Sequence, residues 1–526
     1  MAVKIAIDFG TSNTRVAVWD EGKRSGDALF LPEISAATSV KVNDAVIESF
    51  SVPSLIHYHQ SAVSIGQQVI SGGHENSPTT FKWIKRYISN RMDLPRNVGN
   101  RRVGYSEAGS DFLNQLFNYI SASIEFGNEE VVFTVPVDTY EHYQEWLTQV
   151  CENAGITRWR LLDEPSAAAL GYGVNIQAND VYLIFDFGAG TLDASVVKIE
   201  ANPSGGKRCR VLGKSGTELG GSVIDNWLYR DALAQNKLIP EDVLNLSMLM
   251  LAGVEKAKIK LSSNEKASFS VTDPDTGNVI SASWSRSRFE DVLEENGFYH
   301  VIQNTIDHTL NDASERGIEK DHIKAVLLTG GSSLIPSVRK TLTRIFGQRV
   351  HYHRPLDATV LGAATFAGGV DFYDHIHHDY ALRYYNQQKK DYEFEILVQA
   401  GTSYPSKDPV KELTVKAAFD SQTSLGIDIY EVNRKHINNE NAPLDLVFDP
   451  NGGARFKPKP DARILSSFWM NEKSPTFIKA DPPAMKGDAR FPARFSIDGN
   501  KRLCVTVFDN KTNKHIMIDH PIIRLT

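Results

Sequence analysis

The feature that most constrains this sequence is a stretch that occurs twice. Residues 4–19 are KIAIDFGTSNTRVAVW, and residues 183–197 are LIFDFGAGTLDASVV. In both, an alternating apolar run reaches an aspartate, a tight turn with glycine and threonine follows, and a second alternating run begins. Alternation on both sides of a short glycine-containing turn predicts a β-hairpin. The sequence therefore predicts two copies of one structural unit.

The segments after each hairpin also repeat. Residues 131–155 are typical of a buried strand, a proline and an amphipathic helix, and residues 323–346 again predict a strand, a glycine-rich turn and a helix. At 526 residues the chain is longer than one hydrophobic core usually serves. We therefore expect two similar α/β lobes with a cleft between them, across which Asp8 and Asp186 face each other.

The pattern changes after Gly368 and Gly369. Alternating runs such as YEFEILVQAG and RLCVTVFDNKTNKHIMI then predict an antiparallel β module. We expect a two-lobed domain over residues 1–368, a linker over 369–377 and a β-rich domain over 378–526. Within the last, residues 443–492 carry 8 of the 22 prolines, which predicts long loops rather than regular structure.

Charge and cysteine content exclude several classes of protein. A net charge of −7, from 57 basic and 64 acidic residues, gives no support for nucleic-acid binding. The uncharged run 358–370, rich in alanine and glycine, is too short to span a bilayer and predicts a tightly packed helix. Strand-like sequence begins at Val3, which leaves no room for a signal segment. The three scattered cysteines indicate neither a disulfide framework nor a zinc site, so we expect a cytoplasmic protein without membrane partners.

The two hairpin turns have the composition of phosphate-binding loops. Turns rich in glycine and threonine expose successive backbone N–H groups, which bind phosphate oxygens. The first turn offers Gly10, Thr11, Ser12 and Asn13, and the second offers Gly188, Ala189, Gly190 and Thr191. Two facing turns suit the β- and γ-phosphates of a nucleoside triphosphate, and Asp8 and Asp186 would hold a magnesium ion, through water. The alternative is that each turn only closes its hairpin.

Together, the two hairpins, LLDEPSAAALGYG at 161–173 and LLTGGSSLIP at 327–336 resemble the 70-kDa heat-shock (DnaK-type) chaperones of the actin-like ATPase superfamily. The resemblance runs in order over residues 1–370, and the β module is similar to the family's peptide-binding domain at LVQAGTSYP and FSIDGNKRLCVTVFDNKT. It implies an α/β actin-like ATPase with duplicated ribonuclease H-like lobes, followed by a mainly antiparallel β domain. We expect no counterpart of the family's C-terminal helical lid.

The resemblance also implies roles for individual residues. It places Lys85 beside the γ-phosphate and the attacking water, while Glu164 and Asp193 orient that water and nearby ions. Asp8, Asp186 and Thr191 complete the implied catalytic group. Hydrolysis of a phosphoanhydride needs positioned water and neutralised charge more than covalent help. Without the resemblance, Lys85 is typical of a solvated helix charge, and Glu164 of an acid favoured at a helix N-terminus.

The nucleoside end of the implied site comes from three further segments. Glu255, Lys258, Ile259 and Ser262 have helical spacing and share one face, which the resemblance directs at ribose and adenine. Otherwise that face is a plain surface stripe. Gly220, Gly221, Gly330, Gly331 and Ser332 complete the set. The implied cofactors are ATP or ADP with Mg²⁺, and K⁺ as an optional further ion.

Four positions depart from the family pattern. Ile259 and Leu334 stand where two arginines usually flank the adenine, which leaves an apolar sandwich without guanidinium stacking. Ala189 replaces the middle of three glycines and fits only with a negative φ. Gln144 stands where an arginine helps signalling between domains, so coupling between domains is less well supported than ATP binding.

The linker GVDFYDHIHH also departs, because it lacks the family's Asp-flanked leucine run. Its His375, His377 and His378 have neither a supporting cysteine nor helical spacing of four residues, which favours a solvated segment over a metal site.

The sequence thus predicts an ATP-dependent molecular chaperone whose β domain binds unfolded or extended polypeptide, with ATP binding and hydrolysis switching the affinity of that domain. The implied partners are such polypeptides, a J-domain co-chaperone through Arg160, and a nucleotide-exchange factor; Arg160 is equally typical of a surface arginine. Three alternatives stay open. They are a sugar or acetate kinase, a polymerising actin-like filament protein, and a nucleotide-binding scaffold that hydrolyses ATP weakly.

Overall fold

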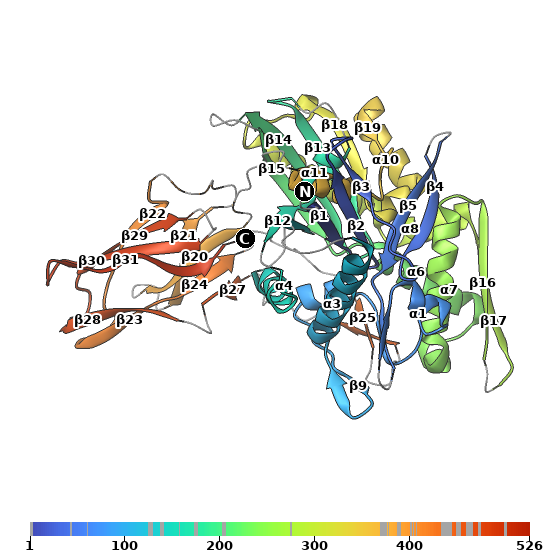
Figure 1. Cartoon of the computed structure of the whole chain (residues 1–526), viewed down its shortest axis with the longest axis horizontal. Helices are drawn as coiled ribbons and strands as arrows, with labels where there is room; N and C mark the ends of the chain where they lie inside the picture. The colour runs from blue at the N-terminus through green and yellow to red at the C-terminus, as the bar shows by residue number, and fades with distance from the viewer. Residues whose placement is uncertain are drawn as a thin grey trace. The chain divides into compact units, whose positions relative to one another are not determined.

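The computed structural model describes residues 4–42, 45–59, 62–124, 130–136, 141–156, 158–172, 177–201, 207–273, 276–368, 376, 378–386, 391–399, 402, 404, 406, 408–432, 444–448, 454–458, 467–471, 475–498 and 502–525. The chain divides into two compact units (Figure 1). The first unit comprises Met1–Val137, Glu145–Tyr373 and Asp445–Lys457, and the second comprises Asp138–Gln144, Asp374–Leu444 and Pro458–Thr526. Most of the predicted linker lies outside the described residues, so the domain boundaries stay a prediction.

The first lobe is built on a mixed sheet whose centre is β1 (Lys4–Phe9). The strands run in the order β12-β11-β1-β2-β5-β4, and β3 pairs with β2. Their bounds are β2 (Asn13–Asp20), β3 (Ser25–Ala28), β4 (Ala36–Val42), β5 (Ala45–Pro53), β11 (Glu130–Val135) and β12 (Trp159–Asp163). β11 is parallel to β1 and β12 to β11, whereas β2 is antiparallel to β1. The apolar run of β1 is buried, as central strands require.

The second lobe repeats this arrangement around β13 (Val181–Phe187). The order is β15-β14-β13-β18-β19, with β14 (Leu192–Ala201), β15 (Lys207–Thr217), β18 (Ile323–Thr329) and β19 (Val350–His351). β14 is antiparallel to β13, while β18 is parallel to it, as β11 is to β1. The two predicted hairpins are therefore the same element of two equivalent sheets, which confirms the duplicated α/β lobes.

Two glycine-containing helices pack directly on each other, one from each half of the unit. α5 (Glu164–Gly171) follows β12, and α11 (Ala358–Ala367) is the predicted packed helix. A Cβ atom on Gly171 would lie 1.7 Å from the carbonyl oxygen of Ala358, and one on Gly362 would lie 1.8 Å from that of Ala167. The backbones thus touch because these positions carry no side chain.

The first unit contains further helices and smaller strands. The helices are α1 (Gln67–Ser71), α2 (Ile84–Ser89), α3 (Tyr105–Ser123), α4 (Glu141–Asn153), which crosses into the second unit, α6 (Gly221–Asn236), η1 (Pro240–Leu246), α7 (Ser247–Leu261), α8 (Arg286–Glu295), α9 (Phe298–Ser314), η2 (Lys320–His322), η3 (Gly331–Leu334), α10 (Pro336–Phe346) and η4 (Gly347–Arg349). The smaller strands are β6 (Ile56–Tyr58), β7 (Val63–Ile65), β8 (Thr80–Phe81), β9 (Arg96–Val98), β10 (Arg101–Val103), β16 (Lys266–Thr272) and β17 (Val279–Ser285). β7, β6 and β8 form a three-stranded sheet. No helix in the described part of the chain is long and apolar enough to cross a membrane.

The second unit is built from antiparallel strands, which Figure 1 draws in orange to red. One sheet has the order β21-β20-β24-β27, with β20 (Asp379–Asn386), β21 (Asp391–Val398), β24 (Ile429–Val432) and β27 (Ser467–Trp469). A second has the order β22-β29-β30-β31, with β22 (Lys411–Val415), β29 (Phe491–Ile497), β30 (Arg502–Asp509) and β31 (Lys514–Arg524). β23 (Gln422–Ile427) pairs with β28 (Thr476–Ala484). Their inward residues form one core, which confirms the β domain.

The prediction of long loops over 443–492 is wrong for its described residues. They include β27, β28 and the paired strands β25 (Leu444–Phe448) and β26 (Ala454–Pro458). Pro482 and Pro483 lie inside β28, where the pairing with β23 shifts register between the pairs Ser424–Lys479 and Gln422–Ala484. A bulge leaves residues without ladder hydrogen bonds, and proline is tolerated there because it has no N–H to donate.

Candidate active site

The first of the two predicted phosphate-binding turns, residues 10–13, is tight, and Ser54, which directly follows β5, holds it in place. A Cβ atom on Gly10 would lie 2.2 Å from the carbonyl oxygen of Asn13, so the turn closes only around glycine. The Ser54 hydroxyl donates to the carbonyl oxygen of Gly10 at 2.8 Å, and the Ser54 N–H donates to that of Ser12 at 2.9 Å. These bonds fix the turn before any ligand arrives.

The second turn is closed on itself and anchored to α6. The Gly188 N–H donates to the carbonyl oxygen of Thr191 at 3.0 Å, and the Gly221 N–H donates to that of Gly188 at 3.0 Å. Ala189 does not have a positive φ, so the condition for alanine at this position is met. A Cβ atom on Gly190 would lie 3.0 Å from Oγ1 of Thr11. The two turns therefore lie against each other.

Four carboxylates gather where the strands of the two hairpins end. Asp8 is on β1, Glu164 begins α5, and Asp186 faces Asp193 across the β13–β14 ladder. Burial raises the pKa of Asp186 well above its ordinary value, and repulsion from Glu164, Asp193 and Asp8 raises this pKa further. A pocket beside them is lined by Pro136, Glu164, Pro165, Ile184, Asp186, Asp193 and Ser195. Crowded buried carboxylates of this kind favour a bound cation.

Lys85 reaches this group from α2. Its Nζ lies 2.8 Å from Oε1 of Glu164, and both side chains are largely buried. The interpretation of Lys85 as a solvated helix charge is therefore wrong. Burial raises the pKa of Glu164, an effect that Lys85 opposes and Asp8 reinforces. Thr134 donates its hydroxyl to Oδ1 of Asp8 at 2.8 Å, which orients that carboxylate.

Three segments of the second lobe converge on the second turn. The Lys258 Nζ donates to the carbonyl oxygen of Gly221 at 2.9 Å, and the Ser332 hydroxyl donates to that of Gly188 at 2.8 Å. Gly330 has φ +82°, and a Cβ atom there would lie 2.3 Å from the carbonyl oxygen of Phe187. Gly220 packs as closely, with its Cβ position 2.3 Å from the Ala189 carbonyl oxygen.

Asp225 is a member of this group that the sequence analysis missed. Its Oδ1 lies 2.8 Å from Nζ of Lys258, and burial raises its pKa to about 7 although Lys258 lowers it. The available signal was its spacing, because a residue four positions after Gly221 lies on the same helix face. Asp225 holds Lys258 beside the second turn.

Among the other predicted positions, Glu255 is linked to this group because its repulsion raises the pKa of Asp225 further. Ile259 is 60% exposed on α7, and Leu334 is half-buried at the end of η3. Glu255 is half-buried on the same helix as Ile259, and Ser262, directly after that helix, is half-buried as well. Their pairing around a base stays a prediction.

The residues that the sequence analysis assigned to partners, to coupling between domains and to the linker lie in different parts of the structure. Arg160 pairs with Glu130, and its guanidinium lies 4.2 Å from the ring centre of Phe366. Gln144 is buried on α4. His375 and His377 lie outside the described residues, while His378 is buried with Nδ1 3.6 Å from Oε1 of Glu431. The J-domain contact of Arg160 stays a prediction.

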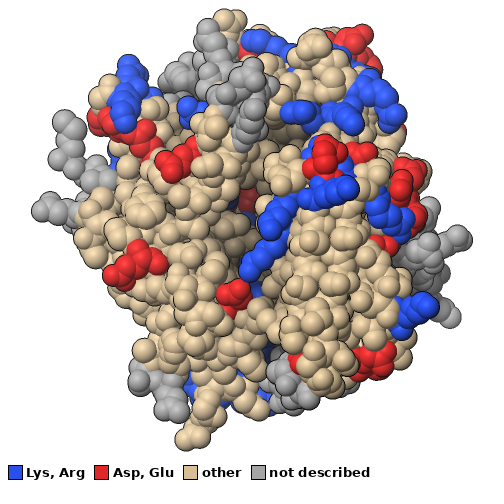
Figure 2. Space-filling view, turned by 90° about the vertical axis from the view of Figure 1, so that its right-hand side faces the viewer, with Lys and Arg blue, Asp and Glu red and all other residues tan. Residues whose placement is uncertain are grey.

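Figure 2 shows the face at the right-hand side of Figure 1. A hollow runs across this face, and lysine and arginine side chains follow one of its edges. Such a hollow with basic side chains at its rim suits the approach of a polyanionic ligand.

The comparisons with known proteins identify the family. The family model described as Hsp70 protein matches residues 4–445, which is most of the chain. The chain belongs to the Hsp70 family. Its relatives include a "Chaperone protein HscA homolog" of Shewanella piezotolerans, 24% identical, in a match that covers 97% of this chain and 76% of the relative.

Two further relatives are similar over nearly the same span. The "Chaperone protein DnaK" of Deinococcus radiodurans is 25% identical over 98% of this chain and 79% of its own length. The "Heat shock 70 kDa protein 6, chloroplastic" of Arabidopsis thaliana is 26% identical over 97% of this chain and 68% of its own length. These matches favour a chaperone over the kinase, filament and scaffold alternatives, and with the duplicated sheets they confirm the actin-like ATPase fold followed by a β domain.

Proposed function

We propose that this protein is an ATP-dependent molecular chaperone, in which the first unit hydrolyses ATP and the second binds extended polypeptide. The observation that supports this most is the joining of the two glycine turns, at Gly190 and Thr11, next to the buried pair of Lys85 and Glu164. Hsp70 proteins bind nucleotide with Mg²⁺ and hydrolyse it, so membership of the family supports this reaction, and we propose these residues as its site.

The backbone N–H groups of the two turns would bind the phosphates of ATP. The turns are already hydrogen-bonded to Ser54 and to α6, so binding costs little reordering. Glu164 would orient the attacking water, because Lys85 holds its carboxylate at 2.8 Å and the pocket is lined by the same side chain. Asp193 lines that pocket as well and would share this role.

The carboxylate group is suited to a hard divalent cation. Repulsion from Glu164, Asp193 and Asp8 penalises the charged form of Asp186, and a bound cation would relieve that penalty. Asp8 and Asp186 would hold Mg²⁺ through water, and the ion would supply charge neutralisation for the phosphates. Oxygen-only donors fit this ion better than they fit a softer metal.

The second unit offers an edge strand with exposed aromatic side chains. β21 ends the order β21-β20-β24-β27 and presents Tyr392 and Phe394, which are 58% and 44% exposed. Tyr384 and Tyr385 on β20 are 40% and 49% exposed. An extended peptide can pair with a free strand edge while its apolar side chains contact such rings. We propose unfolded polypeptides as the clients.

The remaining partners and the location follow from the family and the cysteines. A J-domain co-chaperone at Arg160 and a nucleotide-exchange factor are the co-chaperones we propose. Cys151, Cys209 and Cys504 are buried and form no disulfide, which is compatible with a reducing compartment and hence with a cytoplasmic location.

The test is ATP turnover by the purified full chain, with and without a permanently unfolded polypeptide. We expect slow hydrolysis that requires Mg²⁺ and rises when the polypeptide is added. A kinase would instead transfer phosphate to a small acceptor, and a weakly hydrolysing scaffold would show turnover that the polypeptide leaves unchanged. Absence of hydrolysis, or hydrolysis that the polypeptide leaves unchanged, contradicts the proposal.

A further inference from the structure

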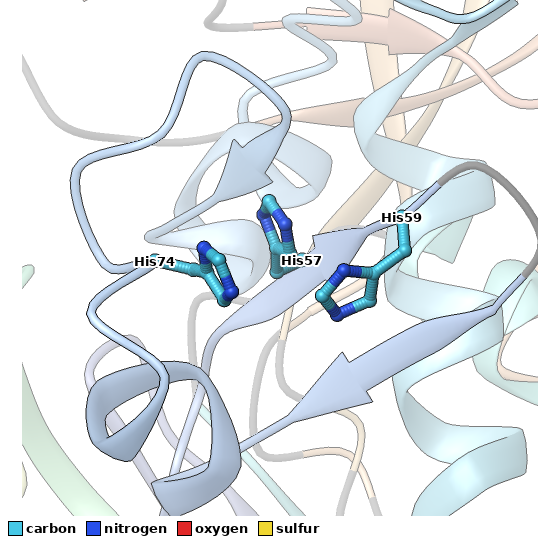
Figure 3. A group of neighbouring side chains, drawn as sticks. All are labelled: His57, His59 and His74. Atoms are coloured by element: carbon cyan, nitrogen blue, oxygen red, sulfur yellow. The ribbon is translucent and has the colours of Figure 1, made fainter.

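Three histidines of the first unit lie together outside the nucleotide site. His57 is on β6, His59 directly follows that strand, and His74 lies after α1 (Figure 3). One ring nitrogen from each lies within 4.8 Å of the other two. Residues two apart on a strand share a face, which brings His57 and His59 together, and the chain returns His74 to the same place. In Figure 3 the three rings converge.

The proton on His57 is assigned by its neighbours. The Thr80 hydroxyl donates its one hydrogen to the carbonyl oxygen of His74 at 2.6 Å. Toward Nδ1 of His57, 2.8 Å away, this hydroxyl can therefore only accept, so Nδ1 carries the proton and Nε2 keeps its lone pair. Fixing the tautomer through the second ring nitrogen is what outer-shell partners do for metal-binding histidines.

The backbone around the other two rings is also fixed. The His74 N–H donates to the carbonyl oxygen of Val69 at 2.9 Å, and the His59 N–H donates to that of Ala62 at 2.9 Å. A Cβ atom on Gly72 would lie 2.8 Å from Cδ2 of His74, so the glycine leaves room for the ring. Nε2 of His59 lies 2.9 Å from the Ser64 hydroxyl.

We propose that His57, His59 and His74 form a binding site for a divalent transition-metal ion, with Zn²⁺ as its occupant. Imidazole nitrogen suits Zn²⁺, and three histidines leave a fourth position for water. A tetrahedral ion with metal–nitrogen distances of about 2.0 Å needs ligand nitrogens roughly 3.3 Å apart. The rings of His57 and His74 are stacked nearly parallel with centroids 4.3 Å apart, so on binding they must rotate out of this stack until both ring planes meet at the ion.

The site would connect two separate pieces of the first lobe. His57 and His59 belong to the β6–β7 hairpin, whereas His74 belongs to the segment that carries Glu75. Oε1 of Glu75 lies 3.5 Å from Nζ of Lys256 on α7 of the second lobe. A bound ion would thus hold the segment that makes this ion pair. This inference does not depend on the proposed ATPase function.

The experiment uses the tag-free full chain, freed of metal by a chelator and then titrated with Zn²⁺ in equilibrium dialysis and calorimetry. We expect one equivalent of Zn²⁺ and a rise in melting temperature. His59→Ala should weaken binding by at least about tenfold. His59 is exposed, so its loss should leave the fold intact. His308→Ala, on the exposed face of α9, is the matched control and should bind as the wild type does.

Cobalt gives a second readout that reports geometry. Co²⁺ at this site should show the visible absorption of a four-coordinate ion, and His59→Ala and His74→Ala should both lose it. Two results would overturn the proposal. One is the absence of stoichiometric Zn²⁺ binding, which leaves a stacked histidine cluster only. The other is equal binding by wild type, His59→Ala and His74→Ala, which places the ion elsewhere, for example on the carboxylates near Asp186.

Discussion

At the scale of single residues, the chemistry of the candidate site depends on the crowding of its buried carboxylates. Glu164 has Lys85 at 2.8 Å, while Asp186 is surrounded by Glu164, Asp193 and Asp8. Burying charge without compensation is costly, so this arrangement is unfavourable for the empty site. It is favourable for a site that must bind Mg²⁺ and phosphate, because the ion then completes the charge balance.

Replacing Lys85 should affect ATP hydrolysis but not ATP binding. Lys85→Ala removes the cation that holds Glu164, while the turns that would bind the phosphates are unchanged. We therefore expect ATP affinity close to that of the wild type and turnover lowered by roughly 10²-fold or more. Calorimetry measures the affinity, and single-turnover hydrolysis measures the chemical step. Lys340→Ala, on the exposed side of α10, is the control. Normal turnover in Lys85→Ala would remove this lysine from the mechanism.

Replacing Asp186 should raise the melting temperature of the protein and abolish its Mg²⁺-dependent turnover. The pKa of Asp186 is raised in the folded protein, so its charged form is penalised there at neutral pH. Asp186→Asn removes that charge, and without Mg²⁺ it should raise the melting temperature by about 2–4 °C, equivalent to about 1 kcal/mol. The gain should vanish below the unfolded pKa of about 3.9 and grow as pH rises toward the raised folded pKa. The same variant should lose Mg²⁺-dependent turnover. A lower melting temperature at pH 7 would contradict the account.

At the scale of elements, the crossing of α5 and α11 is set by two glycines. The closest approach is between Gly362 and the carbonyl oxygen of Ala167, and between Gly171 and that of Ala358. An uncharged, alanine-rich helix such as α11 has little amphipathic character, and its role is to fill the space between the two sheets.

Adding one carbon at Gly362 should separate these helices. In Gly362→Ala the new Cβ atom would lie 1.8 Å from the carbonyl oxygen of Ala167, so the backbones must move apart. We expect the free energy of unfolding of the first unit to fall by about 1–3 kcal/mol. Thr365→Ala on the same helix is the control and should change it by less than about 0.5 kcal/mol. Denaturant titration gives both values, and equal stability of the two variants would show that the crossing is not tight.

The β unit contains a buried ion pair that makes it sensitive to acid. Nε and Nη2 of Arg490 lie 2.7 Å from the two carboxylate oxygens of Asp509, and both side chains are at most 2% exposed. Hydrogen bonds from Arg490 hold the pKa of Asp509 well below its ordinary value. A lowered folded pKa stabilises the fold above the unfolded pKa of about 3.9, and this stabilisation is lost as pH falls through the folded pKa.

Asp509→Asn should therefore destabilise the β unit at neutral pH. It leaves Arg490 buried without its counter-charge, which costs about 3–5 kcal/mol. The difference from the wild type should shrink as pH falls below about 3.9, because the unfolded wild-type carboxylate then takes up a proton while the folded one stays charged down to its lowered pKa. Thermal unfolding at pH 7 and pH 3 measures this, with the exposed Asp488→Asn as control. A difference that is the same at both values would mean that the ion pair does not set the acid sensitivity.

At the scale of the whole molecule, the parts predicted from sequence are those encoded locally. Both hairpins and the β domain follow from alternation over a few residues, and the order of strands around β13 repeats that around β1. Pairs distant in sequence could not be predicted from such patterns. Lys85 and Glu164 are 79 positions apart, and only the family resemblance brought them into one site. The strand character of β28 was hidden because its prolines lie at a register shift.

Communication between the two units is the property that depends on the molecule as a whole. The boundary between the units falls inside α4, between Gln144 and Glu145. Gln144 is buried, and it stands where the family usually has an arginine. An allosteric chaperone must bind peptide with different affinity in its ATP and ADP states, and that ratio measures the coupling free energy.

Gln144→Arg should strengthen this coupling, because an arginine offers five donors in a fixed fork where glutamine offers two. We expect the ratio of peptide affinities in the ADP and ATP states to rise by about fivefold or more, the lower end of typical allosteric coupling. Gln149→Arg, on the exposed side of the same helix, is the matched control and should leave the ratio unchanged. Basal ATP turnover reports whether the buried arginine disturbs the fold. A variant that hydrolyses ATP normally but has the wild-type affinity ratio would show that signalling in this chain does not pass through position 144.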